Sequence, residues 1–131
     1  MHAPANKTAA FLAVREQRSE RALEYLDRAQ ALAPFWAEPV AERAYLVGSL
    51  GDRTAALATY RVALSLADKH TGSSYMKPLI LRGIGFSLTE LGDLDGAQRA
   101  YEDSLKLEPS SELAKKELRY IQQLRAKRKG I

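Results

Sequence analysis

A sequence frame that recurs along the chain constrains its fold more than any other feature. The frame opens with Gly-Asp, continues through an alanine and a tyrosine four residues further on, and ends in Leu-x-Leu; it occupies 51–66 and 92–107. A fainter copy places Ala22 34 residues before Ala56 of the first frame. Such recurrence indicates an array of stacked supersecondary units, because one unit cannot bury its apolar face alone.

Helical periodicity runs through nearly the whole sequence. Apolar residues recur three and four positions apart, and Val, Ile and Thr never alternate with polar residues as a half-buried strand requires. The Gly-Asp pairs at 51–52 and 92–93 suit a helix end followed by a side-chain cap, and Ser19 is expected to cap another helix. The sequence therefore predicts an all-α fold with seven helices, at 5–17, 19–33, 38–50, 53–69, 75–91, 94–107 and 111–128.

Small residues recur where the helices of a pair are expected to cross. Ala56, Gly85 and Ala97 would allow two helix axes to approach closely, and Tyr60 and Tyr101 would fill the space against the next unit. The repeats are therefore predicted to share one continuous core.

In this register the chain resembles the tetratricopeptide repeat family, whose unit is a pair of antiparallel helices. The resemblance is clearest in a third repeat, which carries Gly92-Asp93, Ala97, Tyr101 and Pro109, whereas repeat one has Gln17-Arg18 in place of Gly-Asp. It implies one domain over 1–131, a right-handed α-α superhelix of three helix pairs plus a C-terminal capping helix. The expected parts are repeat one 3–36, repeat two 37–70, an inserted corner 71–77, repeat three 78–111 and the capping helix 112–129.

The residue inventory argues against an enzyme. The chain has no Cys and two His, and neither His2 nor His70 has a second ligand at a spacing that would place both on one helix face. Neighbouring acids such as Asp93 and Asp95 fit a helix start better than general acid–base chemistry. We predict no catalytic residues, no metal site and no cofactor.

The resemblance implies instead a concave groove lined by the first helix of each repeat, which would bind a peptide or helix of a partner protein. Phe11, Tyr45 and Phe86 share one repeat position and would stack along the groove wall, although each has the alternative of packing against a neighbouring helix. The residues predicted to line this partner-binding groove are Lys7, Phe11, Arg15, Glu38, Tyr45, Leu79, Arg82, Phe86 and Glu90.

One specialised form of the family is not expected here. Its chaperone-binding members hold a peptide's terminal carboxylate between basic and amide side chains. Of the matching positions only Lys7 is suitable, and Glu42 would repel a carboxylate. The sequence does not favour a co-chaperone of this type.

The basic C-terminal end offers a different class of function. Residues 125–129 carry four positive charges, so the alternative is an electrostatic adaptor that contacts nucleic acid or anionic lipid. A solvated helix end complementing the helix dipole explains the same charges, and nucleic acid and membrane are not the expected partners.

Three further features carry weaker expectations. Phe35-Trp36 is expected to cover the core at the first corner, or, if exposed, to form a second contact patch. Ser73 or Ser74 in the inserted corner is expected to cap the helix that follows. The degenerate first repeat leaves an edge through which the chain could form a homo-oligomer.

The compartment is not determined by the sequence. The start has no order typical of a secretory signal, and the longest apolar run is interrupted by Arg82 and Gly83. These two observations favour a cytoplasmic location without establishing it. The partner, the pathway and whether the chain is part of a longer protein are not determined either.

Overall fold

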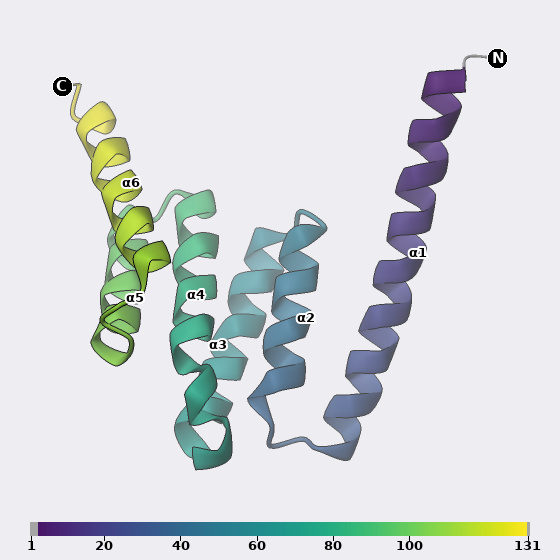
Figure 1. The fold of residues 1–131 in the computed structure, drawn as a ribbon, viewed down its shortest axis with the longest axis horizontal. Helices are drawn as coiled ribbons and strands as arrows, with labels where there is room; N and C mark the ends of the chain where they lie inside the picture. The colour runs from purple at the N-terminus through teal and green to yellow at the C-terminus, as the bar shows by residue number, and fades with distance from the viewer. Residues whose placement is uncertain (1–2, 131) are drawn as a thin grey trace.

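The computed structural model describes residues 3–130, and their side chains from residue 16 onward. Six α-helices and one 3₁₀ helix make up this part of the chain: α1 Ala3–Leu32, α2 Ala37–Ser49, α3 Arg53–Lys69, η1 Thr71–Met76, α4 Lys77–Leu91, α5 Leu94–Leu107 and α6 Glu112–Arg128. Figure 1 shows α2 to α6 side by side in chain order, with α1 at one end and α6 at the other. The prediction of an all-α solenoid is confirmed.

Two helix pairs and the capping helix begin and end close to the predicted positions. Asp52 and Asp93 accept backbone hydrogen bonds at 3.0 Å from Ala55 and Gly96, so each caps the helix that follows it. Gly51 and Gly92 have φ of 103° and 88°, the left-handed conformation that glycine adopts without steric cost. These turns place α2 against α3 and α4 against α5.

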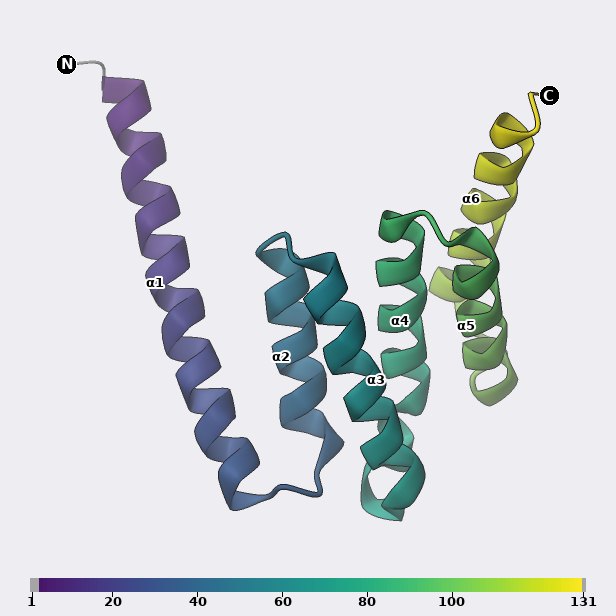
Figure 2. The ribbon, with the colours of Figure 1, turned by 180° about the vertical axis from the view of Figure 1, so that it is seen from behind.

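The first repeat differs from its prediction. Helices were expected at 5–17 and 19–33, but α1 is one helix of 30 residues, and Figure 2 shows its N-terminal part standing away from α2. No Gly or Pro interrupts the segment around Gln17-Arg18, and its Arg, Glu and Gln residues favour a helix interior. Ser19 therefore lies inside α1 instead of capping a second helix.

The core forms between the helices as the small residues predicted. Ala56 and Ala97 are fully buried, and both tyrosines of the repeated frame are buried beside them. A Cβ atom at Gly85 would lie 2.7 Å from the Tyr101 ring. Glycine is therefore what lets this ring pack directly against the backbone of α4.

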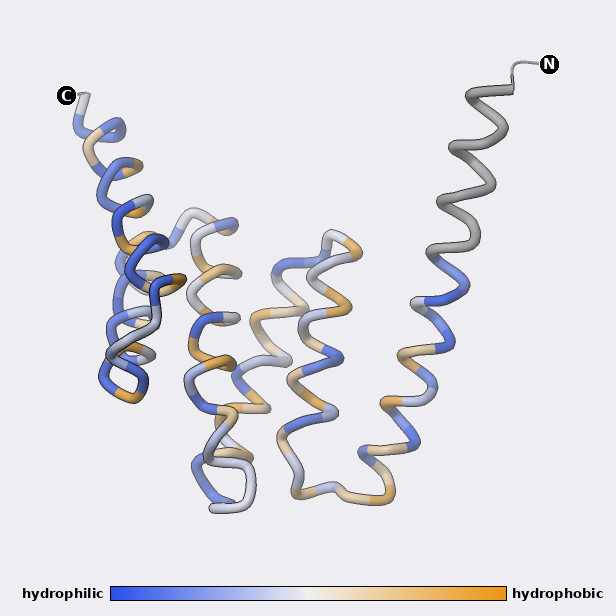
Figure 3. The backbone as a smooth tube through the Cα atoms, viewed as in Figure 1, coloured by the Kyte–Doolittle hydropathy of each residue, from blue (hydrophilic) through white to orange (hydrophobic). Residues whose placement is uncertain are grey.

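Helix α6 covers the end of the array, as predicted for a capping helix. Ala114 and Ile121 are buried, and Leu118 and Leu124 pack against the same core. Figure 3 shows hydrophobic positions recurring along α2 to α5, whereas most of α6 is hydrophilic. None of the helices in the described part has the length and apolar character needed to cross a bilayer.

The inserted corner is a 3₁₀ helix and not an irregular loop. It forms η1, and Ser73 is buried with its hydroxyl oxygen accepting a 3.1 Å hydrogen bond from the backbone N–H of Ala37. Ser73 thus caps α2, whose first residue lies 36 positions earlier in the chain. The prediction that it caps the helix that follows is wrong. α4 begins at Lys77 without a side-chain cap, and Pro78 lies in its first turn.

We expect Ser73→Ala to destabilise the fold by about 1 kcal/mol, because the Ala37 N–H would lose its cap in a buried place. Chemical denaturation of the purified protein measures the change. Ser74→Ala is the matched control, since the Ser74 hydroxyl is exposed and bonds only within η1. Equal stability of the two variants would contradict the role of Ser73.

The expectation that Phe35-Trp36 covers the core is wrong. Phe35 is 62% and Trp36 60% exposed, because the four-residue connection between α1 and α2 runs along the outer corner of the array. The Phe35 ring contacts the His70 ring with 5.1 Å between centroids. His70 thus lies against an exposed aromatic ring.

Candidate functional site

A large groove runs along one face of the array, with side chains from all six α-helices in its wall. Its volume is about 910 Å³, within the range of sites that hold small ligands or peptide side chains. Most of the lining is apolar or aromatic. Its main side chains are Ala22, Tyr25, Leu26, Ala41, Glu42, Tyr45, Arg53, Tyr60, Met76, Leu79, Arg82, Phe86, Tyr101, Leu113 and Glu117.

Four of the nine predicted groove residues line this groove. Tyr45 comes from α2, and Leu79, Arg82 and Phe86 come from successive turns of α4. Tyr45 is 70% and Phe86 41% exposed, so both rings present apolar area to solvent and are not buried in the core. Two positions of the predicted aromatic register therefore line the groove.

The other five predicted residues lie elsewhere or are not described. Glu38 lies in the first turn of α2 and Glu90 in the last turn of α4, and neither lines the groove. The Glu38 side chain is partly buried, and its Oε1 has no hydrogen-bond partner among the described residues. The side chains of Lys7, Phe11 and Arg15 lie outside the described part of the chain, although their backbone belongs to α1.

Arg53 is a groove residue that the sequence did not reveal. It begins α3, and its guanidinium lies over the Phe86 ring at 4.8 Å from the centroid. A Cβ at Gly48 would lie 3.0 Å from the Arg53 Nη1 atom. The missing side chain of Gly48 therefore makes room for an arginine that fixes the Phe86 ring by a cation–π contact.

Three more lining residues were not among those that the resemblance placed in the groove. Tyr25 lies in α1, and Leu113 and Glu117 lie one turn apart in α6. Tyr25 follows Ala22 by three positions and so shares its helix face, a spacing that could have indicated it. The α6 pair could be found only once the position of the capping helix was known.

Charged groups of both signs surround the groove. Arg82 forms an ion pair with Glu108, with 3.5 Å between Nη1 and Oε2, whereas Glu42 and Glu117 contribute negative charge to the lining. A mixed pattern of this kind orients a bound segment more than it attracts one sign of charge.

Two buried tyrosines form the floor. Burial is the main cause that raises the pKa of Tyr60 above its usual value, with Tyr45 adding to the rise and Arg53 opposing it. Burial likewise raises the pKa of Tyr101, with the Glu117 carboxylate adding and Arg82 opposing. Both phenols therefore stay protonated at neutral pH and act as neutral packing groups rather than as bases.

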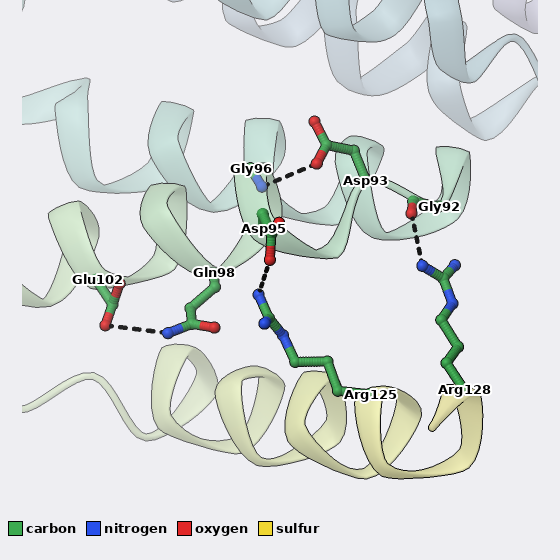
Figure 4. A network of polar contacts seen from close by, with 8 residues as sticks. All are labelled: Gly92, Asp93, Asp95, Gly96, Gln98, Glu102, Arg125 and Arg128. Carbon is green, nitrogen blue, oxygen red and sulfur yellow. Dashed lines mark hydrogen bonds and ion pairs between the residues drawn. The ribbon is translucent and has the colours of Figure 1, made fainter. Parts of the chain in front are cut away.

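The basic C-terminal end is partly used within the molecule. Figure 4 shows Arg125 paired with Asp95 and Arg128 donating to the Gly92 carbonyl. The second contact, at 3.1 Å, satisfies a carbonyl at the end of α4. Two of the four positive charges at 125–129 thus hold α6 against the α4–α5 turn.

No cluster of three or more His, Asp or Glu residues in the described part of the chain is arranged to hold a metal ion.

Comparison with known proteins agrees with the geometry. Residues 83–111 match the tetratricopeptide repeat family, and none of the curated proteins compared with the chain matches it. The first TPR of Spaghetti (RPAP3), solved bound to the HSP90 peptide SRMEEVD, is 22% identical and superposes with a TM-score of 0.73 over 92% of this chain and 90% of its own.

A second solved structure has the same fold. The Sgt2 TPR domain from Aspergillus fumigatus is 17% identical, with a TM-score of 0.72 over 99% of this chain and 84% of its own. The predicted resemblance to tetratricopeptide repeat proteins is confirmed.

Proposed function

We propose that this chain, which has the fold of a tetratricopeptide-repeat domain, is a non-catalytic interaction module whose groove binds a peptide or helix of a partner protein. The observation that carries the proposal is the pair of exposed rings, Tyr45 and Phe86, on the wall of a groove of about 910 Å³. Aromatic side chains in such places provide large contact areas at low cost in conformational entropy.

The wall is also held in position before any partner arrives. Arg53 lies against the Phe86 ring, and the floor beneath is made of buried tyrosines rather than mobile chains. A binding surface that is already ordered loses less entropy when a partner binds. A partner segment with apolar side chains on one face would fit between α2 and α4.

The Spaghetti (RPAP3) domain holds a peptide in its solved structure, which supports peptide binding as the class of function. The chemistry of the peptide need not be shared. Glu42 lines the groove of this chain, and a carboxylate there would repel an acidic peptide end. We therefore propose a partner segment recognised mainly by apolar contacts.

The test begins with partner capture. A photo-crosslinking residue in place of Ser49, at the exposed margin of the groove, would trap a bound protein for identification by mass spectrometry. With that protein in hand, we expect Phe86→Ala to weaken its affinity about 10-fold, and Tyr45→Ala to do the same, because each removes a central aromatic contact. Isothermal titration calorimetry measures both.

Phe35→Ala and Trp36→Ala are the matched controls, since these aromatics are also exposed but line no part of the groove. Unchanged affinity after Tyr45 and Phe86 are both replaced, with helicity preserved, would rule out the groove. Loss of affinity on replacing Lys127 and Lys129 with Gln, together with a steep dependence on salt, would instead favour the electrostatic alternative.

A further inference from the structure

Helix α1 continues through the position where the repeat register places a turn. Gly51-Asp52 separates α2 from α3, and the equivalent pair 34 residues earlier is Gln17-Arg18, inside α1. The part of α1 before this point extends past α2 and does not fold back along the rest of α1 (Figures 1 and 2). The first helix of repeat one is therefore absent from the place that its repeat position assigns to it.

The place it leaves is part of the groove. In repeat two, Ala56 is 1% exposed because α2 packs on it, and a Cβ at Gly48 would lie 3.2 Å from the Ala56 Cβ. The equivalent Ala22 is only partly buried and lines the open groove. We call this part of the groove the seat; its lining residues are Ala22, Tyr25, Leu26, Ala41, Glu42 and Tyr45.

The chain contains a segment that suits the seat. Residues 5–17 carry helix-forming and apolar residues, including Phe11, Leu12 and Val14. Val14 stands at the repeat position of Gly48, so its larger side chain would hold the incoming helix farther from Ala22 than α2 lies from Ala56. Phe11 stands at the repeat position of Tyr45. An apolar helix of this length gains little stability in water unless it packs on something.

A straight α1 cannot bring this segment back to its own seat. We propose that residues 5–17 of one copy pack into the seat of a second copy, and that the second copy does the same in return, forming a domain-swapped dimer. Each copy supplies one helix and one seat, so the arrangement closes on a two-fold axis. A short connection that cannot turn is a known cause of such exchange.

Charge complementarity favours a second copy as the occupant. The incoming segment, residues 5–17, carries Lys7 and Arg15 with Glu16 as its one acid. The seat offers Glu42, and beside it on α2 the partly buried Glu38 has an Oε1 without a hydrogen-bond partner among the described residues. Basic side chains of the second copy would pair with these carboxylates.

The mass of the full chain in solution tests the exchange. One copy has a mass of 14.5 kDa, and light scattering after gel filtration is expected to give twice that value. Replacing Gln17 with Gly and Arg18 with Asp restores the turn found at 51–52, so each segment can reach its own seat. We expect this double variant to be monomeric with helicity unchanged.

The matched control replaces Gln17 and Arg18 with Ala, which keeps the helix straight and should leave the dimer intact. A second variant, Glu42→Lys, is expected to weaken the dimer at least about 10-fold, whereas Glu90→Lys, exposed and outside the groove, should not. These two surface changes keep the test decisive if the turn variant fails to fold.

Three results would overturn the proposal. A monomer at every concentration would mean that the seat is filled within one chain or by a partner segment. A dimer that neither the Gly-Asp change nor Glu42→Lys affects would be held together by another surface. Assembly into open-ended oligomers would contradict a reciprocal exchange between two copies. Phe86 lies outside the seat, so Phe86→Ala tests partner binding without shifting the dimer, and the two proposals can fail separately.

Discussion

Replacing Tyr101 with alanine is expected to lower the free energy of unfolding by about 3–5 kcal/mol, the largest stability effect in the molecule. The side chain is 2% exposed and lies against the backbone of α4 at Gly85. Its removal leaves a cavity between α4 and α5 at the floor of the groove. Because α5 also carries α6, loss of the ring weakens the contact between the second complete repeat and its cap.

Urea denaturation followed by circular dichroism measures this change through the shift of the midpoint. Tyr75→Ala is the matched control, because Tyr75 is an exposed tyrosine on η1, and its replacement should change stability by less than about 0.5 kcal/mol. Tyr101→Phe separates the ring from its hydroxyl. A loss below 1 kcal/mol in Tyr101→Ala would mean that the ring is not part of the core.

The second large effect is expected from Gly85→Val, which should cost about 3 kcal/mol. The Cβ alone would approach the Tyr101 ring to 2.7 Å, and valine adds two methyl groups beyond it. The ring is buried between α4 and α5, so the added methyl groups force the two helices apart or displace the ring from its packed position. The somewhat better helix propensity of valine offsets only a few tenths of a kcal/mol.

Gly72→Val provides the comparison, because a Cβ at Gly72 meets no atom within 4 Å. Thermal unfolding of the two variants should show a clear fall in Tm for the first and little change for the second. Similar Tm values would indicate that the spacing between α4 and α5 adapts to the extra volume, contrary to the close packing of the Tyr101 ring.

The two complete repeats were predictable because their signals are local. Asp52 and Asp93 cap the next helix within three residues, and Gly51 and Gly92 adopt a conformation that few other residues tolerate. Helical spacing also identified the apolar face of α6. The prediction of a turn in the first repeat was wrong for an equally local reason. Gln17-Arg18 contains no turn residue, and the interpretation relied on the repeat period alone.

The groove was predicted in part. The repeat register identified Tyr45 and Phe86, which hold the same repeat position in α2 and α4 and line the groove in the structure. It could not identify Arg53, whose position depends on Gly48 in a different helix, or the α6 residues, which reach the groove only because of how the cap packs. The role of Ser73 was missed for the same reason, since its bond joins residues 36 positions apart.

The sequence alone therefore determined that the chain forms stacked helices, where most of them begin and end, and which tyrosines and small residues make the core. These properties depend on neighbours within one or two helical turns, so periodicity and capping reveal them. Only the tertiary structure decided that Phe35 and Trp36 face solvent and that two C-terminal arginines bind the α4–α5 turn. Those outcomes depend on contacts between segments far apart in the chain, where packing geometry outweighs local preference.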